Sequence, residues 1–192
     1  MGIGIMMEKK RSFWSDYLSK MKGVTRSPRR VPLSEVVWSW IGAFLGILAV
    51  SYIDAKIING TDLVMVIGSF GASAVLIYGA IHSPLAQPRN LLGGHFISAL
   101  IGVSCYKLFP DQIWLASPLA VATAIAVMHL TKTLHPPGGA TALIAVIGSQ
   151  KIHSLGYFYA IVPAGAGALI MLVVALLVNN IPRNRRYPDF WL

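Results

Sequence analysis

A short sequence recurs 68 residues later, each time inside an apolar part of the chain. Residues 71–77 (GASAVLI) correspond to residues 139–145 (GATALIA), with three identical positions and three conservative replacements. Each copy follows a stretch that disfavours regular helix, residues 68–70 (GSF) before the first and residues 135–138 (HPPG) before the second. A repeated and interrupted helix start within a membrane is typical of a transporter's binding site.

The composition is that of an integral membrane protein. Hydrophobic residues make up 55% of the 192 residues, charged residues only 12%, and the mean hydropathy is +0.64. A soluble domain carries about 25% charged residues. The single cysteine, Cys105, cannot form an intramolecular disulfide, so the fold cannot depend on one.

The lengths of the apolar segments predict an all-α fold with about six spans, two of them short and broken. The segments are residues 35–53, 63–81, 90–108, 113–132, 137–150 and 155–179. A straight span needs about 20 residues, which the first, fourth and sixth provide and the third nearly provides. The fifth covers only about 20 Å of a core about 30 Å thick. The second is equally short if its helix begins near Phe70.

The positive charges predict the topology. With the N-terminus inside, 13 Lys and Arg lie inside and three outside, so both termini are expected in the cytoplasm. Because three spans is an odd number, the second group of three enters from the opposite side, which predicts two inverted three-helix repeats. A four-span alternative, with both short segments re-entrant, also keeps the termini inside.

The expected organisation has three parts. They are a basic segment at residues 1–33, a transmembrane domain at residues 34–180 with repeats at about 34–108 and 113–180, and a tail at residues 181–192. Apolar residues at helical spacing predict a short amphipathic surface helix within residues 8–22, with a disordered basic tail as the alternative. Basic clusters beside spans contact anionic lipid in the bilayer, and nucleic acid is not an expected partner.

The paired helix starts favour a small monovalent anion as the ligand. A helix start leaves backbone N–H groups unpaired and carries partial positive charge, and two short helices from opposite faces would bring two such ends toward the midplane. No Asp or Glu lies in the apolar interior, where a cation site would use carboxylates. The expected lining is Gly71, Ser73, Gly139 and Thr141, with Ser69, His135 and Gly138 beside it.

Arg89, Lys132 and His95 complete the substrate-binding candidates, and several of the candidates also have a simple structural alternative. Arg89 and Lys132 are expected at the inner mouth, where they would attract anions over long range, although Arg89 also fits a topology charge. His95 lies within the third segment and could serve the site or a hydrogen bond between helices. His135 could bind a ligand or carry a proton, or simply brace the Pro-Pro break.

Other functions have less support. His129, Met128 and Cys105 do not share the spacing of a known soft-metal motif, so no metal site is expected. The sequence has no HExxH, GxSxG or paired intramembrane carboxylates, so no enzyme, catalytic residue or cofactor is expected. Two alternatives to anion transport stay open, a non-transporting scaffold or sensor and a pore for small neutral solutes. Thin Gly- and Ala-rich segments also suit packing as a homo-oligomer.

Residues 134–143 (LHPPGGATAL) resemble the HPP family of integral membrane proteins, named for its His-Pro-Pro. Residues 68–74 (GSFGASA), 84–90 (PLAQPRN) and 93–95 (GGH) resemble it too, and the resemblance covers about residues 10–192. It implies nitrite transport, with which family members in chloroplasts and cyanobacteria are associated, although many members have no assigned substrate. It also implies a stand-alone prokaryotic member in the plasma (inner) membrane. The residues alone do not separate nitrite from formate, nitrate or chloride.

Overall fold

The structure is a computed structural model that describes residues 13–27, 30–58 and 65–192. The chain divides into two units, residues 1–31 and residues 32–192, which are described separately. Several of the N-terminal basic residues lie outside the described part, namely Lys9, Lys10, Arg11 and Arg29.

The first unit contains one described helix, α1 (Phe13–Lys20), within the span where a surface helix is expected. Residues 8–12 of that span lie outside the described part. The rings of Phe13, Trp14 and Tyr17 pack on one another, with centroids 5.3 to 6.4 Å apart, and all three are exposed. Helix α1 therefore has an exposed aromatic face that the other described residues of its unit leave uncovered.

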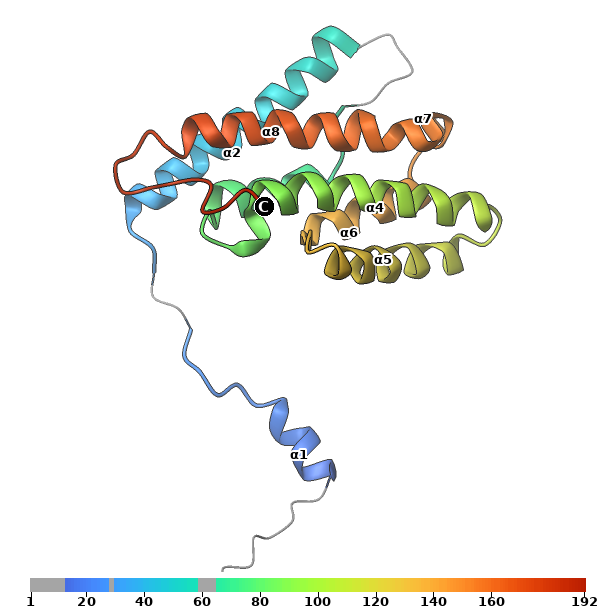
Figure 1. The fold of residues 1–192 in the computed structure, drawn as a ribbon, viewed down its shortest axis with the longest axis horizontal. Helices are drawn as coiled ribbons and strands as arrows, with labels where there is room; N and C mark the ends of the chain where they lie inside the picture. Colours follow the sequence, from blue (N-terminus) through green and yellow to red (C-terminus); the bar gives the residue numbers. More distant parts are fainter. Residues whose placement is uncertain (1–12, 28–29, 59–64) are drawn as a thin grey trace, which may run out of the picture. The chain divides into compact units, whose positions relative to one another are not determined.

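The described residues of the second unit form helices joined by non-helical segments, and they include four helices long and apolar enough to cross a membrane. Figure 1 shows them as the long ribbons of this unit. They are α2 (Leu33–Ile53) extended by η1 (Asp54–Ile58), α4 (Pro88–Leu108), α5 (Ile113–Leu130), and a last helix formed by α7 (Gln150–Leu155), η4 (Gly156–Ala160), η5 (Ile161–Gly165) and α8 (Ala166–Val178). An all-α membrane fold is thereby confirmed.

Two of the long helices begin earlier than the apolar segments predict. The third segment starts at Pro88 rather than residue 90 and so reaches 21 residues, because proline is well tolerated at the first position of a helix. The last apolar helix starts at Gln150 rather than residue 155. It is not straight, because Gly156 has φ +51° and Val162 has extended φ and ψ of −131° and 121°.

The second and fifth segments form the short helices that the sequence predicts. The first short helix is α3 (Ser69–Ala74), continued by η2 (Val75–Gly79), and the second is α6 (Pro136–Ile147). A helix of 12 residues such as α6 is about 18 Å long, well under the thickness of a bilayer core. Residues 65–67 and 133–135, which precede them, are not helical.

Close helix contacts hold the short helices in place. Helix α6 packs between α4 and α5, as Figure 1 also shows, while α3 and η2 pack against α2 and α8. Gly102 of α4 lies against the backbone of Ala142, so that even one added methyl group would overlap it. Gly167 of α8 lies in the same way against the ring of Phe70. Small residues let membrane helices approach closely in this manner.

The C-terminal tail folds back onto the end of η2. The Asn179 side chain donates to the carbonyl of Ile77 (2.8 Å), and the Arg185 guanidinium donates to the carbonyl of Tyr78 (2.7 Å). The Tyr187 hydroxyl donates to the carbonyl of Ala86 in the short η3 helix (Pro84–Ala86) at 2.7 Å. These contacts satisfy carbonyl groups that the end of a helix leaves unpaired.

Candidate functional site

Five polar side chains meet in the apolar interior, and we name them the interior cluster. They come from α3, from α4 and from the start of α6, and each is at most 1% exposed. Its members are Ser69, Ser73, His95, His135 and Thr141. Five of the ten substrate-binding candidates thus lie together, although they are up to 72 residues apart in the sequence.

The Pro-Pro break places His135. A residue before proline is pushed out of the helical region, and His135 accordingly caps α6 with φ −137° and ψ 105°. Its Nδ1 lies 2.8 Å from the carbonyl oxygen of Leu85, and its Nε2 lies 2.9 Å from Ser73 Oγ. The break therefore turns an imidazole into the protein interior and fixes both of its nitrogens.

His95 joins the two copies of the repeated sequence. Its Nε2 lies 2.7 Å from Ser73 Oγ and its Nδ1 lies 2.7 Å from Thr141 Oγ1. Ser73 and Thr141 are the corresponding hydroxyl residues, 68 positions apart. The Thr141 hydroxyl donates to Ser69 Oγ (2.9 Å), so a continuous chain of contacts runs from Ser69 to Leu85.

The interior cluster is fully paired and has no fixed ionic partner. Among the described residues, the buried side-chain atoms without a hydrogen-bond partner belong to Asn179 and Arg185, not to the interior cluster. The two ion pairs of the described chain, His82–Asp189 and Arg185–Glu35, also lie elsewhere. The rings of Phe70 and His95 pack in a T-shaped arrangement, with centroids 5.3 Å apart. The cluster is therefore a polar island in apolar surroundings.

The start of α6 has fewer unpaired backbone N–H groups than predicted for an anion site at a helix start. Its first two residues are Pro136 and Pro137, which have no N–H group, and the N–H of Gly138 donates to the His135 carbonyl (2.8 Å). A Cβ on Gly138 would lie 2.8 Å from the Gly94 carbonyl oxygen, so Gly138 serves the contact between α6 and α4. The start of α6 therefore offers the cluster side-chain donors rather than free N–H groups of its first three residues.

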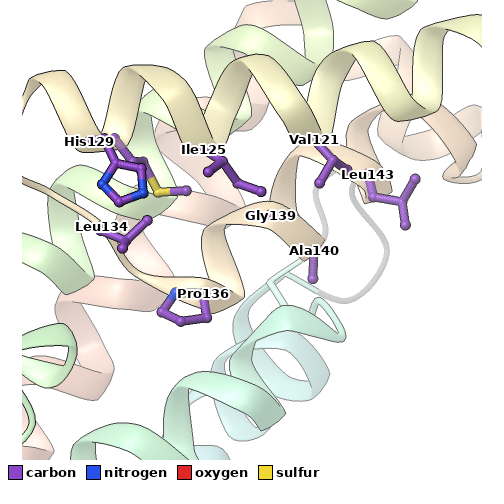
Figure 2. Close-up of a pocket in the computed structure, with 9 residues that line it drawn as sticks. Val121, Ile125, His129, Leu134, Pro136, Gly139, Ala140 and Leu143 are labelled. Carbon is purple, nitrogen blue, oxygen red and sulfur yellow. The ribbon is translucent and has the colours of Figure 1, made fainter. Parts of the chain in front are cut away.

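Gly71 and Gly139 do not face the interior cluster. Gly71 is exposed and has open space around its Cα. Gly139 lines a groove of about 510 Å³ between α5 and α6 (Figure 2). The groove is lined by Val121, Ile125, Met128, His129, Leu134, Pro136, Gly139, Ala140 and Leu143. We place the site in the interior cluster and not in this groove, because the groove is almost wholly apolar and suits an acyl chain.

Arg89 and Lys132 lie near one another but outside the interior cluster. Arg89 donates to the carbonyl of Thr131, the residue before Lys132, at 3.2 Å. Lys132 is exposed and has φ +55° in the turn after α5. Arg89 precedes His95 by six residues on α4, which is about 9 Å along the helix axis. Neither side chain reaches the cluster, so any role they have is at its approach.

Two contributors were missed by the sequence analysis. The carbonyl of Leu85 accepts a hydrogen bond from His135 Nδ1, and the hydroxyl of Tyr159 donates to the carbonyl of Thr141 (3.1 Å). A backbone carbonyl has no sequence signal. Tyr159 lies in an apolar run, where it resembles any other interfacial aromatic, so only the packing of η4 on the core reveals it.

The four long helices, the two short ones and the buried polar island define a multi-span membrane protein. A family model described as the HPP transmembrane region matches residues 28–188, and the chain belongs to this family. This confirms the resemblance that residues 134–143 suggested.

Two proteins of Dictyostelium discoideum, each named only as a transmembrane protein, are similar to the chain. One is 45% identical over 182 residues, covering 93% of this chain and 58% of the relative. The other is 43% identical over 180 residues, covering 91% and 63%. The chain therefore spans about three-fifths of the length of these relatives. No solved structure matches it.

Proposed function

We propose that the protein transports a small monovalent anion, with nitrite as the best candidate, by way of the interior cluster. The observation that carries the proposal is the convergence of Ser73, Thr141, His95 and His135 in a fully buried position between helices. Polar and ionisable groups inside a membrane are costly, and they commonly mark a substrate or proton path.

The proposal includes six crossings arranged as two inverted repeats. Three pairs of corresponding contacts support it. The third helix of each half packs against the first helix of the other, α4 on α5 and α8 on α2. His95 bonds to both Ser73 and Thr141. Lastly, the carbonyls of Tyr78 and Val146, again 68 residues apart, each accept a hydrogen bond from a basic side chain. The donor to Tyr78 is Arg185 and the donor to Val146 is His153.

An anion at this site would be held by hydroxyl and imidazole N–H donors. On binding, the anion would accept hydrogen bonds from donors that otherwise bond within the cluster. This exchange costs less free energy than leaving those donors unpaired in an apolar interior. The donors are neutral or weakly basic, and a small monovalent anion fits them better than a phosphate or a carboxylate ligand that requires paired arginines. Arg89 and Lys132 would raise the local concentration of anions at the entrance.

The remaining parts of the proposal concern setting and partners. We expect no catalytic activity, contact of the basic N-terminal segment with anionic lipid, and assembly as a homo-oligomer. Placement in a prokaryotic inner membrane stays an expectation from the family resemblance, since the two relatives come from a eukaryote. Both termini are expected on the cytoplasmic side.

The test is nitrite uptake by the purified protein in liposomes, with nitrate, formate and chloride as competitors. We expect saturable uptake that is lost in the Ser73→Ala/Thr141→Ala double variant. Normal uptake by that variant, or absence of flux for every anion from folded protein, would contradict the proposal.

The two rival functions predict different results in related assays. Deleting residues 1–28 should leave flux largely intact if the protein transports, whereas a scaffold that recruits partners through its N-terminus should lose its function. A pore for neutral solutes should pass them and show no competition by anions.

A further inference from the structure

The hydrogen atoms of the interior cluster can be counted from its geometry. His135 Nδ1 faces the carbonyl oxygen of Leu85 at 2.8 Å, and a carbonyl only accepts, so this nitrogen carries a hydrogen. The hydroxyl of Thr141 is placed to donate to Ser69 Oγ (2.9 Å) or to the carbonyl of Pro137 (3.3 Å). When the Thr141 hydroxyl donates in this way its one hydrogen is used, and His95 Nδ1 is then the donor in its 2.7 Å contact with Thr141.

In this arrangement the count leaves one hydrogen missing at Ser73. With both Nδ1 atoms protonated, neutral rings of His95 and His135 would each present a bare Nε2 to Ser73 Oγ, at 2.7 and 2.9 Å. Two hydrogen bonds need two hydrogens, and the Ser73 hydroxyl supplies one. A single additional proton completes the set, since one Nε2–H then donates to Ser73 Oγ while Ser73 donates to the other Nε2.

We infer that His95, Ser73 and His135 bind one transferable proton and that the transporter carries this proton together with its anion. The proton is taken up from solution on one side, shared between the two Nε2 atoms through the Ser73 hydroxyl, and released to solution on the other side. No covalent bond to the anion forms or breaks. The inference rests on the proposed anion transport and adds the coupled ion.

The same groups can also satisfy all of their hydrogen bonds without the additional proton. If the Thr141 hydroxyl turns toward His95 Nδ1 and Ser69 donates to Thr141, then His95 carries its hydrogen on Nε2 and donates to Ser73, which donates to His135. Every group keeps a partner in this neutral arrangement. The hydrogen-bond arrangements with and without the proton therefore differ by hydroxyl rotations and a change of the His95 tautomer, with the ring and hydroxyl positions unchanged.

A proton on the two histidines would be the compensating charge for a buried anion, because the described surroundings of the interior cluster supply no other. The two histidine rings face one another, with centroids 5.2 Å apart. The other ionisable group that bonds to a residue of the interior cluster is Tyr159, whose hydroxyl donates to the Thr141 carbonyl. Helix α3 contributes only hydroxyls and Phe70, η3 only the Leu85 carbonyl, and no Asp, Glu, Lys or Arg of the described chain bonds to the cluster. A buried anion needs a compensating charge, and a protonated histidine pair would supply it.

The test uses the full chain in liposomes, with nitrate uptake and internal pH recorded together at a clamped membrane potential. Nitrate is chosen because its conjugate acid is strong, which removes background permeation of the acid itself. We expect uptake to be driven by an inward proton gradient, with one proton per anion and no dependence on potential. Uptake that ignores the proton gradient and follows the potential would overturn the inference and leave anion transport standing. Absence of any anion flux would overturn both.

A variant pair separates the proton relay from simple packing. Ser73→Ala should lower proton-driven uptake by about tenfold or more, because the two rings lose their bridge. Ser98→Ala removes a buried hydroxyl three residues after His95 on α4, outside the chain of contacts, where Ser98 donates to Met128 Sδ at 3.6 Å and lies against Gly138. This variant should keep both uptake and coupling. Equal losses in the two variants would count against the relay.

A measurement on the protein at rest guards against variants that fail to fold. Nitrogen-15 NMR of histidine-labelled protein in liposomes reports which ring nitrogens carry hydrogen. As pH is lowered in the presence of nitrite, we expect the His95–His135 pair to gain one proton in total. Two neutral rings throughout, in protein that still transports, would overturn the inference.

Discussion

The two short helices differ at their starts and agree at their ends. Helix α6 starts with two prolines that lack N–H groups and contributes an imidazole from its cap, whereas α3 starts at Ser69 and contributes two hydroxyls. At the other ends, the corresponding carbonyls of Tyr78 and Val146 are both paired with basic side chains. The difference indicates that side chains supply the hydrogen-bonding groups of the candidate site, and that the two helix starts position these side chains.

The largest effect is expected where α6 touches α4. In Gly102→Ala the new methyl group would overlap the backbone of Ala142, and α4 and α6 must separate. We expect the free energy of unfolding to fall by about 1–3 kcal/mol and uptake to be lost, because His95 and Thr141 move apart. Thermal unfolding in detergent and uptake in liposomes measure the two effects.

Gly71→Ala is the matched control on α3. This glycine has a counterpart in α6 and open space around it, so the same change should alter stability by less than about 0.5 kcal/mol and leave uptake intact. If Gly71→Ala were as harmful as Gly102→Ala, the outward position of Gly71 would be wrong.

The next effect separates the imidazole of α6 from the hydroxyls of α3. His135→Gln breaks the contacts with Ser73 and Leu85 and should reduce uptake by about tenfold or more, because hydrogen bonds to a charged group are worth about 1.5–3 kcal/mol. Ser69→Ala removes one contact at the end of the chain and should cost less than about fivefold. Initial rates at equal protein insertion provide the comparison, and the reverse order would contradict it.

The next expected effect is on stability, at the helix ends. Arg185 is almost fully buried, and burial lowers its pKa while the Glu35 carboxylate, 3.5 Å away, raises it. Arg185→Leu leaves the Tyr78 carbonyl without its donor and should lower stability by about 1–3 kcal/mol. His153→Leu, which removes the corresponding donor from Val146 at a half-exposed position, should cost less. Denaturation midpoints compare the two, and a greater loss for His153→Leu would break the comparison.

The smallest effect concerns the approach to the site. Arg89→Ala should reduce nitrite uptake by about two- to threefold at low salt, and by less at high salt, because a charge at the partly exposed approach acts over a distance that ions screen. Uptake rates at two ionic strengths test this. A loss that salt does not change would instead place Arg89 in direct contact with the anion.

Much of the fold could be predicted from the sequence because lipid limits the choices. Apolar length predicts the long helices, and the Gly- and Pro-containing breaks before residues 71 and 139 predict the short ones. The starts of α4 and the last helix were missed, since Pro88 and Gln150 are not apolar enough to extend a hydropathy pattern. The tail's return to η2 depends on packing between distant residues and has no local signal.

The site could be predicted in its residue types but not in its arrangement. An intramembrane histidine and hydroxyls at repeated positions drew attention to His95, Ser73 and Thr141, and the structure places them in contact. Gly71 and Gly139 were expected in the site because they begin the repeated sequence, but helix rotation turns them outward. The sequence gives the period of a helix and not which face its neighbours cover.

The most direct test of the central claim is nitrite uptake by Ser73→Ala set beside Ser98→Ala. Both variants remove one buried hydroxyl from the same core, but only Ser73 lies in the interior cluster. If the cluster is the anion's path, uptake falls about tenfold or more in Ser73→Ala and stays near the wild-type rate in Ser98→Ala. Equal rates in the two folded variants would show that the anion does not pass through the interior cluster.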